Sequence, residues 1–181
     1  MRVILLLIYL SVPVNIDVLV TESGVCYDGI PYVRTTMDFK EYVKGVLPNE
    51  WYPSFEQESL RAGAVAVKQF AVREYLVHGY LWGCNWDQVY NPVMRTEATD
   101  KAVDDTWGVW LIDDEIVKTY HDDRYSTCLL RGATNCMGQW DSQTMALEGM
   151  GYRSILTSFY EGEIVTPPLS RIDWFLSSLL W

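Results

Sequence analysis

Residues 41–75 read EYVKGVLPNEWYPSFEQESLRAGAVAVKQFAVREY, and this stretch decides the architecture that we expect. From Leu60 onward, apolar residues recur at helical spacing, and many of them are small. Pro48 and Pro53 precede this pattern and disfavour a continuous helix. We therefore predict a long amphipathic helix over residues 55–76, against which another element packs closely, and a turn ahead of it.

Three charged residues stand out on this stretch. Glu50 lies in the predicted turn, and Ser54 is the expected N-cap of the helix that follows. Arg61 and Lys68 are seven residues apart, nearly two helical turns, so they project from the same side of the helix. Two cations near one acid suit an anionic or hydroxyl-rich ligand. Solvated surface charges are the alternative interpretation.

The flanking regions complete the expected fold. Residues 15–33 carry β-type residues broken by glycines and read as short strands and turns. Residues 37–46 resemble a short helix, with Asp38 near its start, where an acid suits the helix dipole. Because strand-like and helical segments alternate, we predict one α+β domain with a mixed sheet and the 55–76 helix at its centre.

Composition limits the function classes. The 181 residues are within the range of one domain, and 49% are apolar and 21% charged, as is typical of a globular protein. The net charge is −10, from 24 acids against 14 lysines and arginines. Such a chain has no obvious source for the phosphate neutralisation on which nucleic-acid affinity depends, so we exclude binding to DNA or RNA.

The two ends of the chain are apolar. After a positive charge at the N-terminus, an apolar run continues to Val14, about the length of the core of a secretory signal and too short to span a bilayer comfortably. We predict a signal peptide or N-terminal anchor over residues 1–18, the domain over residues 19–165 and an apolar tail, packing or partner-binding, over residues 166–181. A buried first strand is the alternative for the N-terminal run.

Cysteine positions agree with secretion. Cys128 and Cys136 are near enough in sequence to close a short loop, which leaves Cys26 to pair with Cys84. In a reducing compartment these residues would be buried thiols instead. None of them shows a CxxC spacing, and we expect no metal and no cofactor.

Several blocks of the chain resemble the SpoIID/LytB family of stage II sporulation protein D and amidase-enhancer domains. They follow the order of the family and together span about 125 residues. The blocks are GVLPNEW with its helix at residues 41–75, DQVY at 87–90, ATDKAVDDTWG at 98–108, VKTYH at 117–121 and the closing stretch MGQWDSQTMALEGMGYRSILTSFYEGEIV at 137–165.

The resemblance implies roles for individual residues. Members act on bacterial cell-wall peptidoglycan, and the Glu at the position of Glu50 is their catalytic residue. In the family, basic residues occupy the positions of Arg61 and Lys68. Here Arg stands where the family has Lys, and Lys where it has Arg, so the charge is kept but the guanidinium, with its planar set of N–H donors, is at the other position. The expected substrate-binding residues are Arg61, Lys68, Gln88, Tyr90, His121, Gln139 and Trp140. Packing for Tyr90 and Trp140, and a surface position for His121, are the alternatives.

Two departures from the family pattern affect the second half of the site. The family's Ser-Ser-Gly-Gly loop after the YH pair is replaced by DDRYSTCLLRGATNC at residues 122–136, and the interval is shorter. Part of the substrate cleft is then missing or rebuilt. Some members hold zinc through Cys and His near the CQVY element, but here Asp87 precedes Gln88 and only Cys84 lies nearby, too few ligands for zinc.

One carboxylate suits one reaction on this substrate. Ordinary glycoside hydrolysis needs two carboxylates, whereas in lytic cleavage the C6 hydroxyl of N-acetylmuramic acid attacks its own anomeric carbon, so one residue serves as acid and then base. As an acid, Glu50 needs a raised pKa, which Leu47, Pro48 and Trp51 favour by desolvation and Arg61 and the helix dipole oppose. The sequence leaves this balance open.

These inferences predict a secreted or cell-wall-associated lytic transglycosylase that acts on peptidoglycan glycan strands, with Glu50 as its acid and base. One alternative is a non-catalytic wall-binding module that enhances a partner N-acetylmuramoyl-L-alanine amidase. A structural protein that keeps only the scaffold is the third. Membrane association through the N-terminal apolar segment is compatible with each of them.

Overall fold

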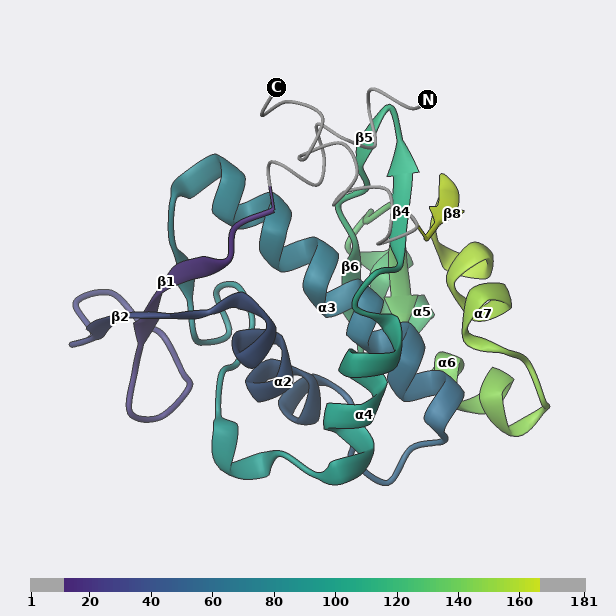
Figure 1. The fold of residues 1–181 in the computed structure, drawn as a ribbon, viewed down its shortest axis with the longest axis horizontal. Coiled ribbons are helices and arrows are strands. Elements are labelled where there is room, and N and C mark those ends of the chain that lie inside the picture. Colours follow the sequence, from purple (N-terminus) through teal and green to yellow (C-terminus); the bar gives the residue numbers. More distant parts are fainter. Residues whose placement is uncertain (1–11, 167–181) are drawn as a thin grey trace, which may run out of the picture.

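A computed structural model of the chain describes residues 12–166 (Figure 1). Helices dominate, and the strands are short, which confirms the predicted single α+β domain. In chain order the elements are β1 (Asn15–Val20), β2 (Val33–Asp38), α2 (Phe39–Glu50), α3 (Gln57–His78), β3 (Leu81–Trp82), the 3₁₀ turn η1 (Pro92–Met94), α4 (Glu97–Thr106), β4 (Trp110–Asp113), β5 (Glu115–Ile116), β6 (Tyr120–Asp122), α5 (Tyr125–Leu130), β7 (Cys136–Gly138), α6 (Gln139–Leu147), α7 (Tyr152–Phe159) and β8 (Glu163–Val165).

The strands form three small sheets in the described part of the chain. The first has the order β2-β1-β3 and is mixed, because β1 runs antiparallel to β2 and parallel to β3. The second, β5-β4-β8, is antiparallel, and the third is the parallel pair β6 and β7. The mixed sheet that the sequence predicts is therefore present as one of three sheets.

Helix α3 passes through the middle of the molecule, where it packs against α2, α4, α6 and α7 (Figure 1). It begins at Gln57, two residues after the predicted start, and its N-cap is Glu56, with no side-chain hydrogen bond to the cap. Ser54 as N-cap was therefore wrong. Most residues from Ser59 to Val72 are buried, so the helix is apolar around most of its circumference and not along one stripe.

Helix α2 corrects the predicted turn. It begins after Asp38, whose side chain accepts the backbone N–H of Glu41 at 3.0 Å, as the expected dipole argument requires. It then continues through Pro48 as far as Glu50. In the same turn, the carbonyl of Gly45 accepts the side-chain amide of Asn49 at 2.7 Å and the backbone N–H of Asn91 at 3.0 Å.

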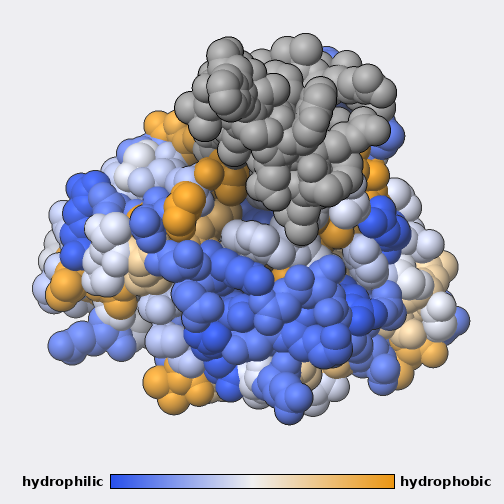
Figure 2. Space-filling view, viewed as in Figure 1, coloured by the Kyte–Doolittle hydropathy of each residue, from blue (hydrophilic) through white to orange (hydrophobic). Residues whose placement is uncertain are grey.

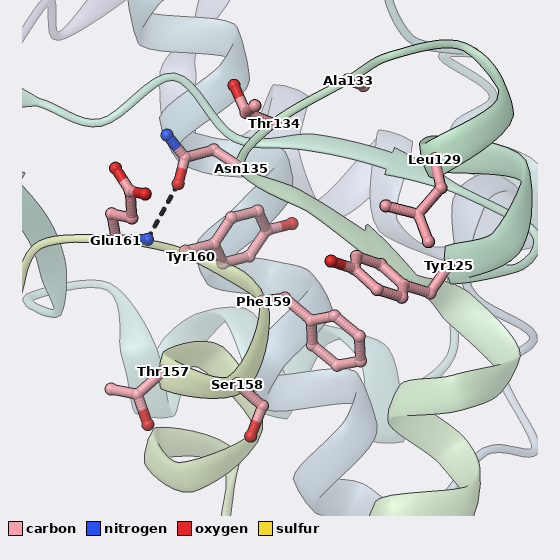
Figure 3. Close-up of a pocket in the computed structure, with 10 residues that line it drawn as sticks. All are labelled: Tyr125, Leu129, Ala133, Thr134, Asn135, Thr157, Ser158, Phe159, Tyr160 and Glu161. Atoms are coloured by element: carbon pink, nitrogen blue, oxygen red, sulfur yellow. Dashed lines mark hydrogen bonds between the residues drawn. The ribbon is translucent and has the colours of Figure 1, made fainter.

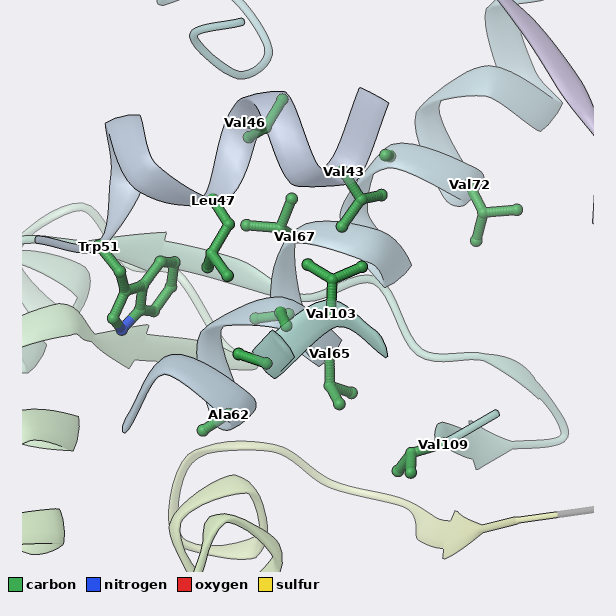
Figure 4. Close-up of a cluster of buried hydrophobic side chains, with 14 of the residues drawn as sticks. Val43, Val46, Leu47, Trp51, Ala62, Val65, Val67, Val72, Val103 and Val109 are labelled. Atoms are coloured by element: carbon green, nitrogen blue, oxygen red, sulfur yellow. The ribbon is translucent and has the colours of Figure 1, made fainter. Parts of the chain in front are cut away.

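Small residues allow the central elements to pack closely. Valines, alanines and leucine from α2, α3 and α4 fill the core between these helices (Figure 4). Gly63 of α3 lies against the ring of Trp51, and a Cβ at this position would be 2.6 Å from Cδ2 of the indole. The close packing that the sequence predicts is therefore an indole ring seated directly on the helix backbone.

Two disulfides cross-link the domain as predicted. The long-range bridge joins Cys26 to Cys84, which are 58 residues apart, and the short-loop bridge joins Cys128 to Cys136, which are 8 apart. The long-range bridge connects the loop after β1 to the loop after β3. The short-loop bridge ties α5 to β7.

The N-terminal run and the tail lie largely outside the described residues, namely positions 1–11 and 167–181. Within the segment predicted as signal or anchor, residues from Asn15 onward form β1, with Ile16 and Val18 buried in the sheet. No helix between residues 12 and 166 has the length and apolar character needed to cross a membrane.

Candidate functional site

The site centres on a carboxylate and an imidazole from distant parts of the chain. Glu50 is the last residue of α2, and His121 is the middle residue of β6. Oε2 of Glu50 and Nε2 of His121 are 3.2 Å apart. Both side chains are largely enclosed, with 17% of Glu50 and 8% of His121 exposed. Two predicted site residues are therefore in direct contact.

Trp51 holds both residues of the pair in place. It follows Glu50 directly and ends α2 by donating its backbone N–H to the carbonyl of Leu47 at 2.8 Å. Its fully buried indole donates Nε1–H to Ser142 of α6 at 3.1 Å, and its ring centroid is 5.0 Å from that of His121. The orientation of the helix end and the position of the imidazole are thus fixed by one side chain.

The strand that carries His121 is held on its other side. β6 pairs with β7 in parallel, with His121 opposite Met137. The short-loop bridge fixes β7 to α5. The ring of Phe70, on α3, is 6.3 Å from the imidazole. His121 is therefore supported by a sheet, a disulfide and the central helix.

The surroundings of Glu50 decide its protonation. Burial raises the pKa of its carboxyl, but the hydrogen bond and charge of His121 and the backbone N–H of Val89, 3.0 Å from Oε1, together lower that pKa below the ordinary value of 4.5. The balance that the sequence left open is settled toward the ionised form. In the free protein Glu50 is a carboxylate at neutral pH.

The tautomer of His121 follows from its hydrogen bonds. Nδ1 is buried and has no partner among the described residues. A proton on that nitrogen would be a buried donor without an acceptor, which is costly. We therefore assign the neutral ring a proton on Nε2, donated to the carboxylate of Glu50. The carboxylate then accepts N–H donors at both of its oxygens.

The two predicted cations do not face Glu50. Arg61 pairs with Glu58 and Asp105, within a band of charged side chains that covers α2 and α4 (Figure 2). Lys68 is almost fully buried, and its ammonium donates to the backbone carbonyls of Trp107 and Val109 at 2.7 and 2.6 Å.

Lys68 therefore has a structural position and offers no donor to a ligand in this conformation. A third carbonyl, that of Thr106, accepts from its ammonium at 3.1 Å, and the ammonium lies 4.1 Å from the ring centroid of Trp110. Burial, and to a smaller extent the charge of Lys40, lowers the pKa of Lys68 well below its usual value. The residue fastens α3 to the segment between α4 and β4.

Gln88 and Tyr90 flank the site without facing it. Gln88 is buried, and its side-chain amide donates to the carbonyl of Val67 on α3. Tyr90 is half-buried and stacks on Tyr42, with ring centroids 5.6 Å apart. The residue between them, Val89, contributes the N–H that binds Glu50. The DQVY block thus reaches the site through its backbone, which a pattern of side chains could not indicate.

Trp140 belongs to an aromatic surface next to the pair, and Gln139 begins the helix that carries it. Trp140 is 39% exposed, and its ring is 5.4 Å from that of Tyr52 and 4.8 Å from that of Phe55. Tyr52 is 60% exposed and lies two residues after Glu50. We call Tyr52, Phe55 and Trp140 the aromatic platform. Sequence reasoning selected Trp140 but missed Tyr52, although an aromatic residue two positions after Glu50 was a usable signal.

A separate cavity of about 280 Å³ lies behind the rebuilt loop and does not include Glu50 (Figure 3). Its wall is shared by α5, the loop before β7 and the end of α7, and Asn135 accepts the backbone N–H of Glu161 there at 2.8 Å. The lining residues are Tyr125, Leu129, Ala133, Thr134, Asn135, Thr157, Ser158, Phe159, Tyr160 and Glu161. Residues 12–166 contain no group of three or more His, Cys, Asp or Glu side chains placed to hold a metal ion.

A carboxylate and an imidazole that are in contact and largely enclosed can exchange a proton, and this geometry is compatible with an acid–base site. The family described as Stage II sporulation protein, SpoIID, matches residues 28–112, a range that contains Glu50 and Val89. This match supports membership of the SpoIID family and suggests a function related to the cell wall.

The chain also matches a curated relative. The chain is 31% identical over 116 residues to an uncharacterized protein of Brachyspira hyodysenteriae. The aligned part is 55% of this chain and 32% of the relative, so the match spans about a third of that protein.

Proposed function

We propose that this protein is a lytic transglycosylase that cleaves peptidoglycan glycan strands and leaves 1,6-anhydro-muramic ends, with Glu50 as its acid and base. The observation that carries the proposal is the contact between Glu50 and His121, 3.2 Å apart and mostly enclosed. No second carboxylate is needed for this reaction, because the substrate supplies its own nucleophile.

The pair supplies the proton that the first step needs. When the imidazole of His121 is protonated, its Nε2 proton is within hydrogen-bond reach of Oε2 of Glu50. A glycan seated over the pair excludes water, and a dry environment favours the neutral acid and neutral imidazole over two charges. Proton transfer from Nε2 to Oε2 then converts Glu50 into the acid and leaves the remaining proton of the imidazole on Nδ1, a cost that binding of the glycan must offset.

The reaction balances without water. Glu50 gives its proton to the glycosidic oxygen, and the bond between that oxygen and the anomeric carbon of N-acetylmuramic acid breaks. The C6 hydroxyl of the same ring then forms the new bond to the anomeric carbon and gives its proton to the carboxylate of Glu50. Glu50 then returns this proton to Nε2 of His121, and its lowered pKa is suited to the restored resting state, in which His121 and Val89 again bind the carboxylate.

The disulfides support a location outside the cytoplasm. Two bridges close within the domain, and stable disulfides are formed in oxidising compartments. The family association with the cell wall agrees with this location. Secretion under the direction of the N-terminal segment belongs to the same proposal, and that segment lies mostly outside the described residues.

The amidase-enhancer role is the second candidate, and the rebuilt loop favours it. Helix α5 presents Leu129 and Leu130 to solvent, 59% and 88% exposed, beside the short-loop bridge. Exposed leucines on a helix that is held by a disulfide suit contact with another protein. In this role the chain would speed a separate N-acetylmuramoyl-L-alanine amidase without cleaving glycan itself.

Digestion of peptide-free glycan strands tests the proposal. Wild type, Glu50→Gln and Glu22→Gln are compared by mass spectrometry for anhydro-muramic ends, where Glu22 is an exposed acid that offers the same charge change away from the site. We expect products from wild type and Glu22→Gln and a loss of at least about a hundredfold for Glu50→Gln.

Two results would contradict this assignment. Equal product from Glu50→Gln and wild type would remove Glu50 as the acid. No product from wild type, together with faster digestion when the chain is added to an amidase, would replace the enzyme proposal with the enhancer.

A further inference from the structure

A second group of aromatic side chains lies at the mixed sheet, apart from the aromatic platform. Three rings stand nearly perpendicular to that of Trp82, with centroid distances of 4.8 Å for Trp86, 5.2 Å for Tyr32 and 6.3 Å for Tyr80. We call these four residues the distal aromatic cluster. Tyr32 is 51% exposed and Trp86 45%. Strand β2, which follows Tyr32, and α6, which carries Trp140, lie at opposite sides of the molecule (Figure 1).

Cross-links hold the loops of the distal aromatic cluster in place. The long-range bridge joins the loop before β2 to the loop that carries Trp86. In this second loop, the side chain of Asn85 accepts the backbone N–H of Cys26 at 2.7 Å, and the carboxylate of Asp87 accepts the backbone N–H of Trp82 at 2.7 Å. The exposed rings are therefore presented in a fixed arrangement, which keeps the entropy cost of binding a ligand low.

The loop that carries Trp86 also contacts the site. The backbone N–H of Gln88 donates to the carbonyl of Trp82 at 3.5 Å and closes the loop. The next residue, Val89, donates its backbone N–H to Glu50 at 3.0 Å. Trp86 and Val89 are three positions apart, so their Cα atoms are separated by at most about 11 Å. The distal aromatic cluster is therefore within reach of a polymer that is bound at Glu50.

The charge of this surface restricts what can bind to it. Residues 21–33 and 79–94, which supply the cluster and its loops, contain no lysine or arginine, and their exposed charged residues, Glu22 and Asp28, are acidic. The guanidinium of Arg34, next along the chain, is held in an ion pair. An anionic polymer would meet like charge here and no free cation. The rings suit instead an uncharged ligand with apolar C–H faces, which an N-acetylated pyranose presents.

We propose that the distal aromatic cluster is a remote binding surface for the uncharged sugar faces of an N-acetylated glycan, and that it holds strands that also occupy the site at Glu50. This inference rests on the proposed function and identifies a second contact for the same polymer. Sugar rings stack on Tyr32 and Trp86, whose phenol O–H and indole N–H can donate to sugar oxygens. A strand long enough to reach both places gains from both contacts, whereas a fragment gains from one.

Binding is measured separately from cleavage, so that the two proposals can fail independently. The probe is N-acetylchitohexaose, an uncharged N-acetylated glycan without muramic acid. It is titrated into the isotope-labelled full chain, and NMR follows the indole N–H of Trp82, the centre of the cluster, which every variant keeps. Trp86→Ala and Tyr32→Ala remove exposed rings, whereas Trp86→Phe keeps a ring. Tyr125→Ala is the matched control, because Tyr125 is 39% exposed and lies on α5, outside the cluster.

We expect a saturable shift of the Trp82 resonance, with nearly the same affinity between about 0.05 and 0.5 M salt, because no charge takes part in the contact. Affinity should fall at least about fivefold in Trp86→Ala and in Tyr32→Ala, as for an aromatic ring that anchors an interface. It should fall less in Trp86→Phe and stay unchanged in Tyr125→Ala. In cleavage of peptide-free strands, Trp86→Ala should raise KM by about the same factor and leave kcat unchanged, because the cluster does not touch the reacting atoms.

Several outcomes overturn the inference: no shift of the Trp82 resonance, an affinity that survives Trp86→Ala and Tyr32→Ala, or an equal loss in Tyr125→Ala. Self-association that Trp86→Ala abolishes, without binding of the sugar, would assign the surface to a second copy of the chain. If wild type cleaves strands while one of these is found, only the role of the cluster fails. If the cluster binds the sugar but wild type cleaves nothing, the contact stands and the proposed enzyme fails.

Discussion

Replacement of Gly63 by alanine tests how Trp51 is held beside Glu50 and His121. The added Cβ would lie 2.6 Å from Cδ2, 2.8 Å from Cε2 and 3.0 Å from Cγ of the indole. Carbon atoms in favourable contact are about 3.5 Å apart or more, so ring and helix must separate by about 0.9 Å. The ring cannot swing into solvent, because it is fully buried and its N–H is bound to Ser142.

The expected change in stability is the difference of two effects. Overpacking a closed site of this kind costs about 1–3 kcal/mol. Alanine in place of glycine inside a helix contributes about 0.5–1 kcal/mol of stability in return. The free energy of unfolding should therefore fall by about 1 kcal/mol, which for a chain of this size lowers Tm by about 2–4 °C. Displacement of Trp51 should also reduce glycan cleavage, because the same ring packs on His121.

Urea unfolding followed by circular dichroism measures the effect, and a double-mutant cycle with Trp51→Phe isolates its cause. The smaller ring leaves room for the Cβ, so the cost of Gly63→Ala should shrink by most of its value in that background. A Gly63→Ala variant that is more stable than wild type would refute the packing described for Trp51. The same conclusion would follow if its cost were unchanged in the Trp51→Phe background.

Three further predictions concern the cross-links, the buried cation and the carboxylate. Removal of the long-range bridge by Cys26→Ser and Cys84→Ser should lower the free energy of unfolding by about 4 kcal/mol, and removal of the short-loop bridge by about 2.5 kcal/mol, because the bridges close loops of 58 and 8 residues. Urea unfolding of both variants checks this order. Lys68→Met should lower the free energy of unfolding by about 2–4 kcal/mol, since buried carbonyls lose their donor. The control Lys101→Met, on the surface, should change it by less than about 0.5 kcal/mol. A Lys68→Met variant as stable as wild type would contradict the structural role of Lys68. Because the pKa of Glu50 is lowered by folding, its carboxylate stabilises the folded state at pH values above the ordinary pKa of 4.5. This contribution is lost as the pH falls through the lowered pKa. The Tm difference between wild type and Glu50→Gln should therefore narrow below about pH 4.5 and not as the pH rises above it.

Local patterns in the sequence were sufficient for several elements. The run of small apolar residues after Leu60 predicts the central helix to within two residues at each end, because 3.6-residue periodicity is a property of the helix itself. Asp38 as the start of α2 is equally local. The spacing of Cys128 and Cys136 favoured the observed disulfide pairing, although the sequence left three pairings open. Glu50 was recognised because its motif is contiguous.

The predictions that were wrong or incomplete concerned residues whose positions depend on contacts between distant segments. Pro48 lies inside α2, in a turn that is packed in the core and bound by Asn91 from a distant loop, and no pattern around the proline indicates this. Lys68 was expected beside a ligand, but the carbonyls that receive its ammonium belong to a segment about 40 residues away. His121 was a candidate on its own, whereas its contact with Glu50 required the parallel pairing of β6 and β7.

The distance along the chain between Glu50 and His121 has a consequence for when the site exists. The two residues are 71 positions apart, and neither the helix end nor the strand alone brings them together. A chain in which only α2 and α3 have formed has no imidazole beside the carboxylate. The contact between Glu50 and His121 therefore exists only once β6 has taken its place beside α2, so under the proposed function an incompletely folded copy would not cleave glycan.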